Sequence, residues 1–194
     1  MIDYLTYYYR MDQEPFQSLS ALTDQEAIKI MEELCDDTPY GERFKDPIQY
    51  LKNRKDTEQW VRKAFLAKGG RPKDEFPISM VLGSSKWLEK ASPDPKQHGE
   101  IRIPLSIFTF EDVSFTYPDS MLSRWFGQDK PAEFYQAEFH GIIFTLPEIF
   151  LIVEKNGMPE EDWEIKLPER LAPYIEAQVW NRGILLDYWK RIRT

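Results

Sequence analysis

Residues 115–121 carry the sequence feature that most directly suggests chemistry. They read FTYPDSM, so an aromatic stretch leads into a turn at Pro118, Asp119 and Ser120 whose side chains can hydrogen-bond to the local backbone. Functional side chains often lie on loops that follow strands. The alternative is that Asp119 and Ser120 cap a helix that begins near Met121. The sequence favours the capping role and leaves the functional role open.

Two histidines and one cysteine limit the metal and nucleophile chemistry of the chain. A mixed site of His98 and Glu100 with Glu138 and His140 is conceivable, since each pair would share one face of a strand at a period of two residues. Surface turns are the simpler interpretation of both histidines, so we predict no metal site. Cys35 follows apolar residues at helical spacing and is expected to be a small core residue.

The common cofactor and catalytic signatures are absent from the sequence. It contains neither GxxxxGK[ST] nor GxGxxG, so both common phosphate-binding loops of nucleotide-binding proteins are missing. The GxSxG nucleophile elbow and the HExxH zinc motif are missing as well. We therefore predict that the protein holds no cofactor.

Charge is unevenly distributed along this acidic chain, which has 25 Lys and Arg residues against 33 Asp and Glu residues. Residues 43–73 nevertheless contain ten basic and three acidic residues. Such a stretch can contact an acidic partner, although a solvated helix face is the simpler interpretation. We expect no binding to duplex DNA, because the acidic remainder of the chain repels phosphate. The basic residues expected to be largely exposed are Arg54, Arg62, Lys63 and Lys68.

The composition is typical of a protein with a packed core. The chain has 194 residues, of which 42% are hydrophobic, and includes 6 Trp, 10 Tyr and 12 Phe. No apolar run approaches the roughly 20 residues that span a bilayer, so we expect no membrane contact. The start of the chain lacks the pattern of a signal peptide, and one cysteine cannot form an internal disulfide. These features predict a cytoplasmic, aromatic-rich globular protein.

Helix start and stop signals occur at several places along the chain. Thr23 and Glu26 form a capping-box pattern, and a second such pattern precedes residue 146. Asp46 followed by Pro47 is typical of a helix start, with a break allowed near residue 56. The helices predicted from these signals and from apolar spacing cover residues 24–35, 46–68, 146–156 and 183–192.

Short apolar or alternating runs between these helices predict strands. They cover residues 4–10, 77–83, 101–108, 113–117, 140–144 and 174–180. The order of elements predicts a single α+β domain over residues 1–194, with a mainly antiparallel sheet of four to six strands flanked by about four helices. Within it, residues 24–70 are helix-rich, residues 77–144 are strand-rich and residues 145–194 are mixed.

Three short motifs carry a family resemblance. Arg10 closes YLTYYYR, Ser120 follows VSFTYPD, and Glu176 lies within YIEAQVW. This order resembles ADP-ribosyltransferase-like domains, in which a basic residue holds the phosphate of a dinucleotide and a glutamate orients the ribose or stabilises a positively charged sugar. The resemblance implies that Arg10, Ser120 and Glu176 are catalytic. The chain as a whole also resembles bacterial proteins of unassigned function.

Two functional interpretations follow, and the sequence does not decide whether the protein is an enzyme. The first is an interaction or ligand-binding module whose partner is a protein or a small molecule. The alternative is an ADP-ribosyltransferase-like enzyme that acts on a dinucleotide. Convergence of Arg10 and Glu176 in one cleft would favour the enzyme, and their separation would favour the module. If Ile175, Ala177 and Val179 face the core, Glu176 points to the opposite face of the sheet.

Overall fold

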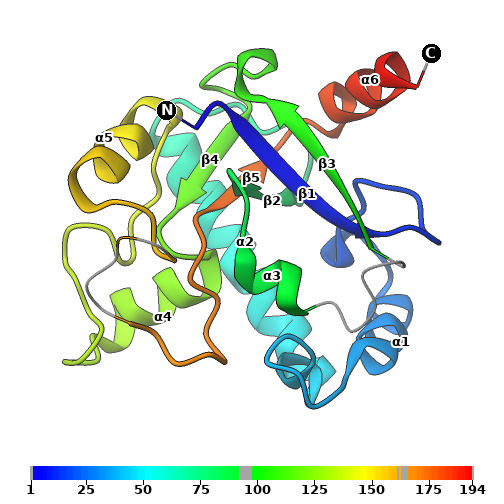
Figure 1. Cartoon of the computed structure of the whole chain (residues 1–194), viewed down its shortest axis with the longest axis horizontal. Helices are drawn as coiled ribbons and strands as arrows, with labels where there is room; N and C mark the ends of the chain where they lie inside the picture. The colour runs from blue at the N-terminus through cyan, green and yellow to red at the C-terminus, as the bar shows by residue number, and fades with distance from the viewer. Residues whose placement is uncertain (1, 92–97, 161, 163–165, 194) are drawn as a thin grey trace.

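The computed structural model describes residues 2–91, 98–160, 162 and 166–193 (Figure 1). Within them, five strands form one antiparallel sheet in the order β3-β1-β2-β5-β4. This arrangement confirms the predicted α+β fold with a sheet of four to six strands. The strands are β1 (Tyr4–Arg10), β2 (Ile78–Leu82), β3 (His98–Pro104), β4 (Val113–Thr116) and β5 (Glu176–Val179).

Helices surround the sheet, and several begin at the predicted signals. Glu26 N donates to Thr23 Oγ1 at 3.3 Å while Thr23 N donates to Glu26 Oε2 at 3.1 Å, which completes the capping box of α1. Asp46 accepts from Gln49 N at 3.0 Å and starts α2. The α-helices are α1 (Asp24–Leu34), α2 (Pro47–Ala67), α3 (Lys86–Ala91), α4 (Ser120–Asp129), α5 (Leu146–Asn156) and α6 (Arg182–Ile192). Short 3-10 helices are η1 (Leu19–Ala21), η2 (Gly41–Phe44) and η4 (Leu105–Ile107).

One face of the sheet is apolar and forms the largest core. It packs against Ile149 of α5 and Leu185 of α6, both fully buried. Alternate positions of the strands supply this face, as expected for side chains that repeat every two residues. Its buried side chains include Leu5, Met80, Ile103, Phe115 and Ala177.

The opposite face of β4 and β5 is buried but polar. Ser114 Oγ donates to Gln178 Oε1 at 2.9 Å, and Gln178 Nε2 donates to Thr116 Oγ1 at 3.1 Å. Trp180 Nε1 donates to Ser114 Oγ at 2.9 Å and packs with Phe65 of α2. The helix α2 passes behind the sheet on this side (Figure 1). The space between α2 and the sheet is therefore partly filled by hydrogen-bonded polar groups, which can position a functional site.

Several local predictions were wrong for identifiable reasons. Residues 140–144 form only an isolated bridge, in which Phe144 pairs with Phe115 of β4. Pairing of β3 ends at Pro104, and the chain continues as η4 rather than as a strand to residue 108. The helix α2 runs without a break, and α3 adds to the predicted helices, whereas α4 is the helix that the sequence favoured near Met121. Cys35 is exposed, because α1 ends one residue earlier.

No helix in the described ranges has the length and apolar character that crossing a bilayer requires.

Candidate ligand-binding site

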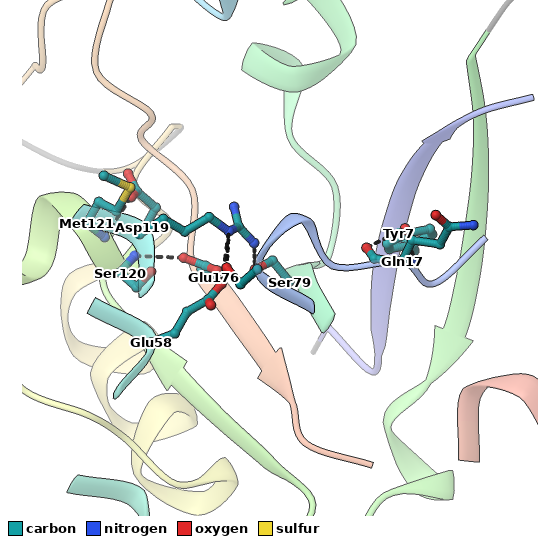
Figure 2. Close-up of polar contacts among 10 residues, drawn as sticks. Tyr7, Gln17, Glu58, Ser79, Asp119, Ser120, Met121 and Glu176 are labelled. Carbon is teal, nitrogen blue, oxygen red and sulfur yellow. Dashed lines mark hydrogen bonds and ion pairs between the residues drawn. The ribbon is translucent and has the colours of Figure 1, made fainter. Parts of the chain in front are cut away.

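Two of the predicted site residues, Ser120 and Glu176, lie in direct contact (Figure 2). Ser120 N donates to Glu176 Oε2 at 2.8 Å, and the two residues are 6% and 8% exposed. The register of the sheet explains this contact, because Thr116 at the end of β4 pairs with Glu176 at the start of β5. The turn after β4 therefore brings the first residue of α4 against the Glu176 carboxylate. Glu176 lies on the face opposite Ala177, as the alternation of β5 predicted.

Asp119 adds a second carboxyl group to this contact. It caps α4 by accepting from Met121 N at 3.0 Å and Leu122 N at 3.3 Å, which confirms the capping role. Burial, together with the neighbouring Glu176 carboxylate, raises the pKa of Asp119 to about 7. At neutral pH Asp119 is therefore a mixture of the protonated and ionised forms beside Glu176.

Arg43 of η2 brings a guanidinium close to these carboxyl groups. Its guanidinium carbon lies 4.9 Å from the ring centroid of Tyr40 and 5.1 Å from that of Trp87. Tyr174 continues this aromatic wall, with its ring centroid 6.2 Å from that of Trp87. Among the described residues, no carboxylate forms an ion pair with Arg43, although its positive charge offsets part of the rise in the pKa of Asp119. Arg43 is thus a half-buried cation stacked on aromatic rings.

Arg54 and Glu58 form an ion pair one helical turn apart on α2, with 2.9 Å between Arg54 Nε and Glu58 Oε1. Their side chains are only 18% and 5% exposed. Arg54 also donates to Ser20 Oγ at 3.2 Å and to Ser79 Oγ of β2 at 3.3 Å. Burial raises the pKa of Glu58. Glu58, Ser79, Ser120 and Glu176 gather in one region of Figure 2.

The prediction that Arg54 is exposed was therefore wrong. The reason is that α2 turns its polar side toward the polar face of the sheet, where Glu58 and two serines satisfy the guanidinium. Arg62 is also half-buried, whereas Lys63 and Lys68 are exposed as predicted.

Two adjoining cavities open around these residues. The smaller has a volume of about 270 Å³, and Arg43, Asp119 and Glu176 are among its lining residues. The larger, of about 450 Å³, lies along β1 and the segment from α1 to η2. Both volumes are of the order of small-molecule sites. The residues that line both cavities are Arg43, Tyr50, Arg54, Ser79 and Tyr174.

Arg10, the third predicted site residue, lies at the larger cavity and is not among the residues that line the smaller one. Its guanidinium is paired with Asp12, with Nη2 donating to Oδ2 at 2.7 Å and Nε to Oδ1 at 3.1 Å. The structure thus brings Ser120 and Glu176 together and places Arg10 elsewhere in the cavity system. The catalytic role of these residues stays a prediction.

Sequence reasoning missed the position of Arg43 at the site and the raised pKa of Asp119. The sequence did contain a pattern that could have marked Arg43 as a stacked cation, because Tyr40, Phe44 and Tyr50 lie close to it in the chain. Phe44 packs edge-on against both tyrosines, with ring centroids 5.5 and 5.1 Å away. Interleaving of a cation with aromatic residues differs from a solvated helix face, which carries few aromatics.

Within the part of the chain that the structure describes, no group of three or more His, Cys, Asp or Glu side chains could hold a metal ion. Glu138, a member of the conceivable mixed site, pairs with Lys155 at 2.6 Å. His140 is 3% exposed rather than in a surface turn, and burial lowers its pKa to about 4. Its Nδ1 accepts from Gln136 N at 3.0 Å, which supports a structural role.

Comparisons with protein-family models, curated proteins and solved structures find no match to this chain. The geometry of the site is therefore the basis for the functional argument.

Proposed function

We propose that this protein binds a small anionic ligand in the two adjoining cavities, with Arg43 as the anion anchor. The observation that carries the proposal is the Arg43 guanidinium, which lines both cavities, rests on Tyr40 and Trp87 and has no carboxylate partner among the described residues. The proposal develops the ligand-binding interpretation of the sequence.

Stacking explains why Arg43 suits this role. Aromatic rings cover the faces of a guanidinium, while its N–H donors lie in the guanidinium plane and point outward from the edges. Those edges match the oxygens of a phosphate or carboxylate, which accept two hydrogen bonds from one arginine. Partial burial strengthens such a contact, because the local dielectric constant is lower than that of water.

Asp119 and Glu176 give the site a capacity for proton transfer. A carboxyl group whose pKa lies near 7 is protonated in part of the molecules and can donate a proton to a bound ligand. Glu176, which accepts from Ser120 N, supplies the neighbouring carboxylate. In this proposal Asp119 is the acid or base, and its burial, together with the neighbouring Glu176 carboxylate, raises its proton affinity.

The variant Arg43→Gln tests the anion site directly. A charge-assisted contact contributes about 1.5–3 kcal/mol, so its loss should weaken binding of ribose 5-phosphate roughly 10- to 100-fold in calorimetric titration. The matched control is Arg71→Gln, whose side chain is 77% exposed and lines neither cavity. Equal affinities of the wild type and Arg43→Gln, or absence of binding to the wild type, would contradict the proposal.

A second candidate function is glycosyl transfer from a dinucleotide, which the contact between Ser120 and Glu176 favours. In this reaction the bond between the nicotinamide nitrogen and the ribose carbon breaks, and its electron pair leaves with the ring. An acceptor oxygen then bonds to that carbon and loses its proton. Glu176 would stabilise the positive charge that develops on the sugar, and Arg43 would hold the pyrophosphate.

We predict that Glu176→Gln abolishes any such consumption of NAD⁺ and leaves the melting temperature nearly unchanged. The amide keeps an oxygen that can accept from Ser120 N, so the local fold is maintained while the charge is lost. The measurement is the release of nicotinamide from NAD⁺ by each purified protein. Absence of release by the wild type would remove this candidate and would leave anion binding in place.

We also propose a cytoplasmic location. The exposed thiol of Cys35 supports it, because free surface thiols are typical of proteins from reducing compartments. The prediction that the protein does not bind duplex DNA continues to rest on the acidic net charge of −8.

A further inference from the structure

The larger cavity differs in character from the smaller one. Its lining includes Tyr8 of β1 and Tyr40 before η2, together with apolar residues such as Ile30 of α1. Aromatic side chains of this kind bind planar rings by stacking, and each stacked base contributes about 1–3 kcal/mol. The aromatic and apolar lining therefore favours an uncharged planar group.

The rim of this cavity favours hydrogen-bond donors. Glu14 and Glu33 are exposed lining residues, and Asp36 is a third carboxylate at the cavity. The charge of Arg10 is matched by Asp12 through two hydrogen bonds. Carboxylates accept hydrogen bonds from amino groups and repel phosphate. An anionic group is consequently directed to Arg43, and an amino-bearing group is directed to the rim.

Because Arg43 lines both cavities, an anion bound to it lies at their junction. We infer that the ligand is a nucleotide, whose amino-substituted base enters the larger cavity while its phosphate binds Arg43. A group esterified to that phosphate would then extend into the smaller cavity, toward Asp119 and Glu176. This inference rests on the proposed anion site and adds the chemical class of the ligand.

The experiment compares four probes by calorimetric titration: AMP, IMP, ribose 5-phosphate and adenosine. AMP should bind roughly tenfold or more tightly than ribose 5-phosphate, since stacking of the base adds to the phosphate contact. It should also bind more tightly than IMP, which lacks the amino group. Adenosine, without a phosphate, should bind weakly and independently of Arg43.

Two cavity-filling variants provide matched controls. Ile30 is half-buried and lines only the larger cavity, whereas half-buried Met121 lines only the smaller one. Ile30→Trp should weaken AMP binding about tenfold and leave ribose 5-phosphate within about twofold of the wild type. Met121→Trp should not reproduce this selective loss of AMP over ribose 5-phosphate, because it leaves the larger cavity open. Leu34→Trp, on the same wall as Ile30, replaces Ile30→Trp if that variant has a lowered melting temperature.

The outcomes separate this inference from the proposed function. If ribose 5-phosphate binds as tightly as AMP, or if AMP binding survives both Ile30→Trp and Leu34→Trp, the base site is refuted and the Arg43 anion site stands. Equal affinities for AMP and IMP would refute the role of the rim carboxylates. If none of the phosphates binds, both proposals are overturned.

Discussion

At the scale of single residues, Asp119 links proton binding to stability. Its pKa of about 7 in the folded protein exceeds the ordinary value of 3.8, so the folded state binds the proton more tightly than the unfolded state. Between pH 4 and 7 the free energy of unfolding should therefore fall as pH rises, by about 4 kcal/mol in total from this group. Asp119→Asn keeps the helix cap and removes the titration.

We accordingly predict that Asp119→Asn is more stable than the wild type at pH 8, and that its stability varies less between pH 4 and 7. Urea denaturation over that pH range measures both effects. Asp187→Asn is the control, since that side chain is 74% exposed and should give a curve parallel to the wild type. Parallel curves for Asp119→Asn and the wild type would show that Asp119 does not titrate in this range.

At the scale of elements, α2 is attached to the sheet partly by charge. Arg54 connects Glu58 on its own helix to Ser79 of β2 and Ser20 of η1. Removing one partner of a buried ion pair leaves an uncompensated charge and costs about 3–5 kcal/mol, whereas replacing both partners by apolar residues is often nearly neutral.

A double-mutant cycle tests this attachment. Arg54→Met should lower the free energy of unfolding by about 3 kcal/mol, because it leaves the Glu58 carboxylate buried without a cation. The double variant Arg54→Met with Glu58→Met should recover most of that loss, as measured by urea denaturation. Additive losses from the two single variants would instead mean that the side chains act independently.

The scale of elements also shows how far the sequence could predict the fold. Thr23 and Asp46 mark the starts of α1 and α2 because a cap depends on residues within one helical turn. The alternation around Glu176 predicted which face of β5 it occupies for the same local reason. The prediction that Arg54 is exposed was wrong because its burial depends on contact with Ser79 of β2, which lies farther along the chain.

At the scale of the whole molecule, the site combines residues that are far apart in the sequence. Arg43, Asp119 and Glu176 come from η2, the turn before α4 and β5, and all three line the smaller cavity. Asp119 and Glu176 lie close together because β4 pairs with β5. Strand order is a long-range property, so local patterns did not reveal that Arg43 lines the same cavity as Glu176. The contact between Ser120 and Glu176 could be anticipated only through the family resemblance, and its catalytic meaning stays a prediction.

Substitutions on the apolar side of the sheet should therefore change stability, whereas substitutions on the polar side should change ligand binding. Leu185 of α6 is fully buried in the apolar core, on the face opposite the one that carries Glu176. Leu185→Ala should lower the free energy of unfolding by about 2–5 kcal/mol, because it removes buried methyl groups and leaves a cavity. The affinity of this variant for AMP, measured at a temperature where it is folded, should stay within about twofold of the wild type, since no contact of Arg43 changes.

Arg43→Gln should show the converse, with weakened AMP binding and little change in the free energy of unfolding measured by urea denaturation. A parallel loss of affinity in Leu185→Ala would mean that the apolar core also controls the shape of the cavities, and that the two faces act as one unit.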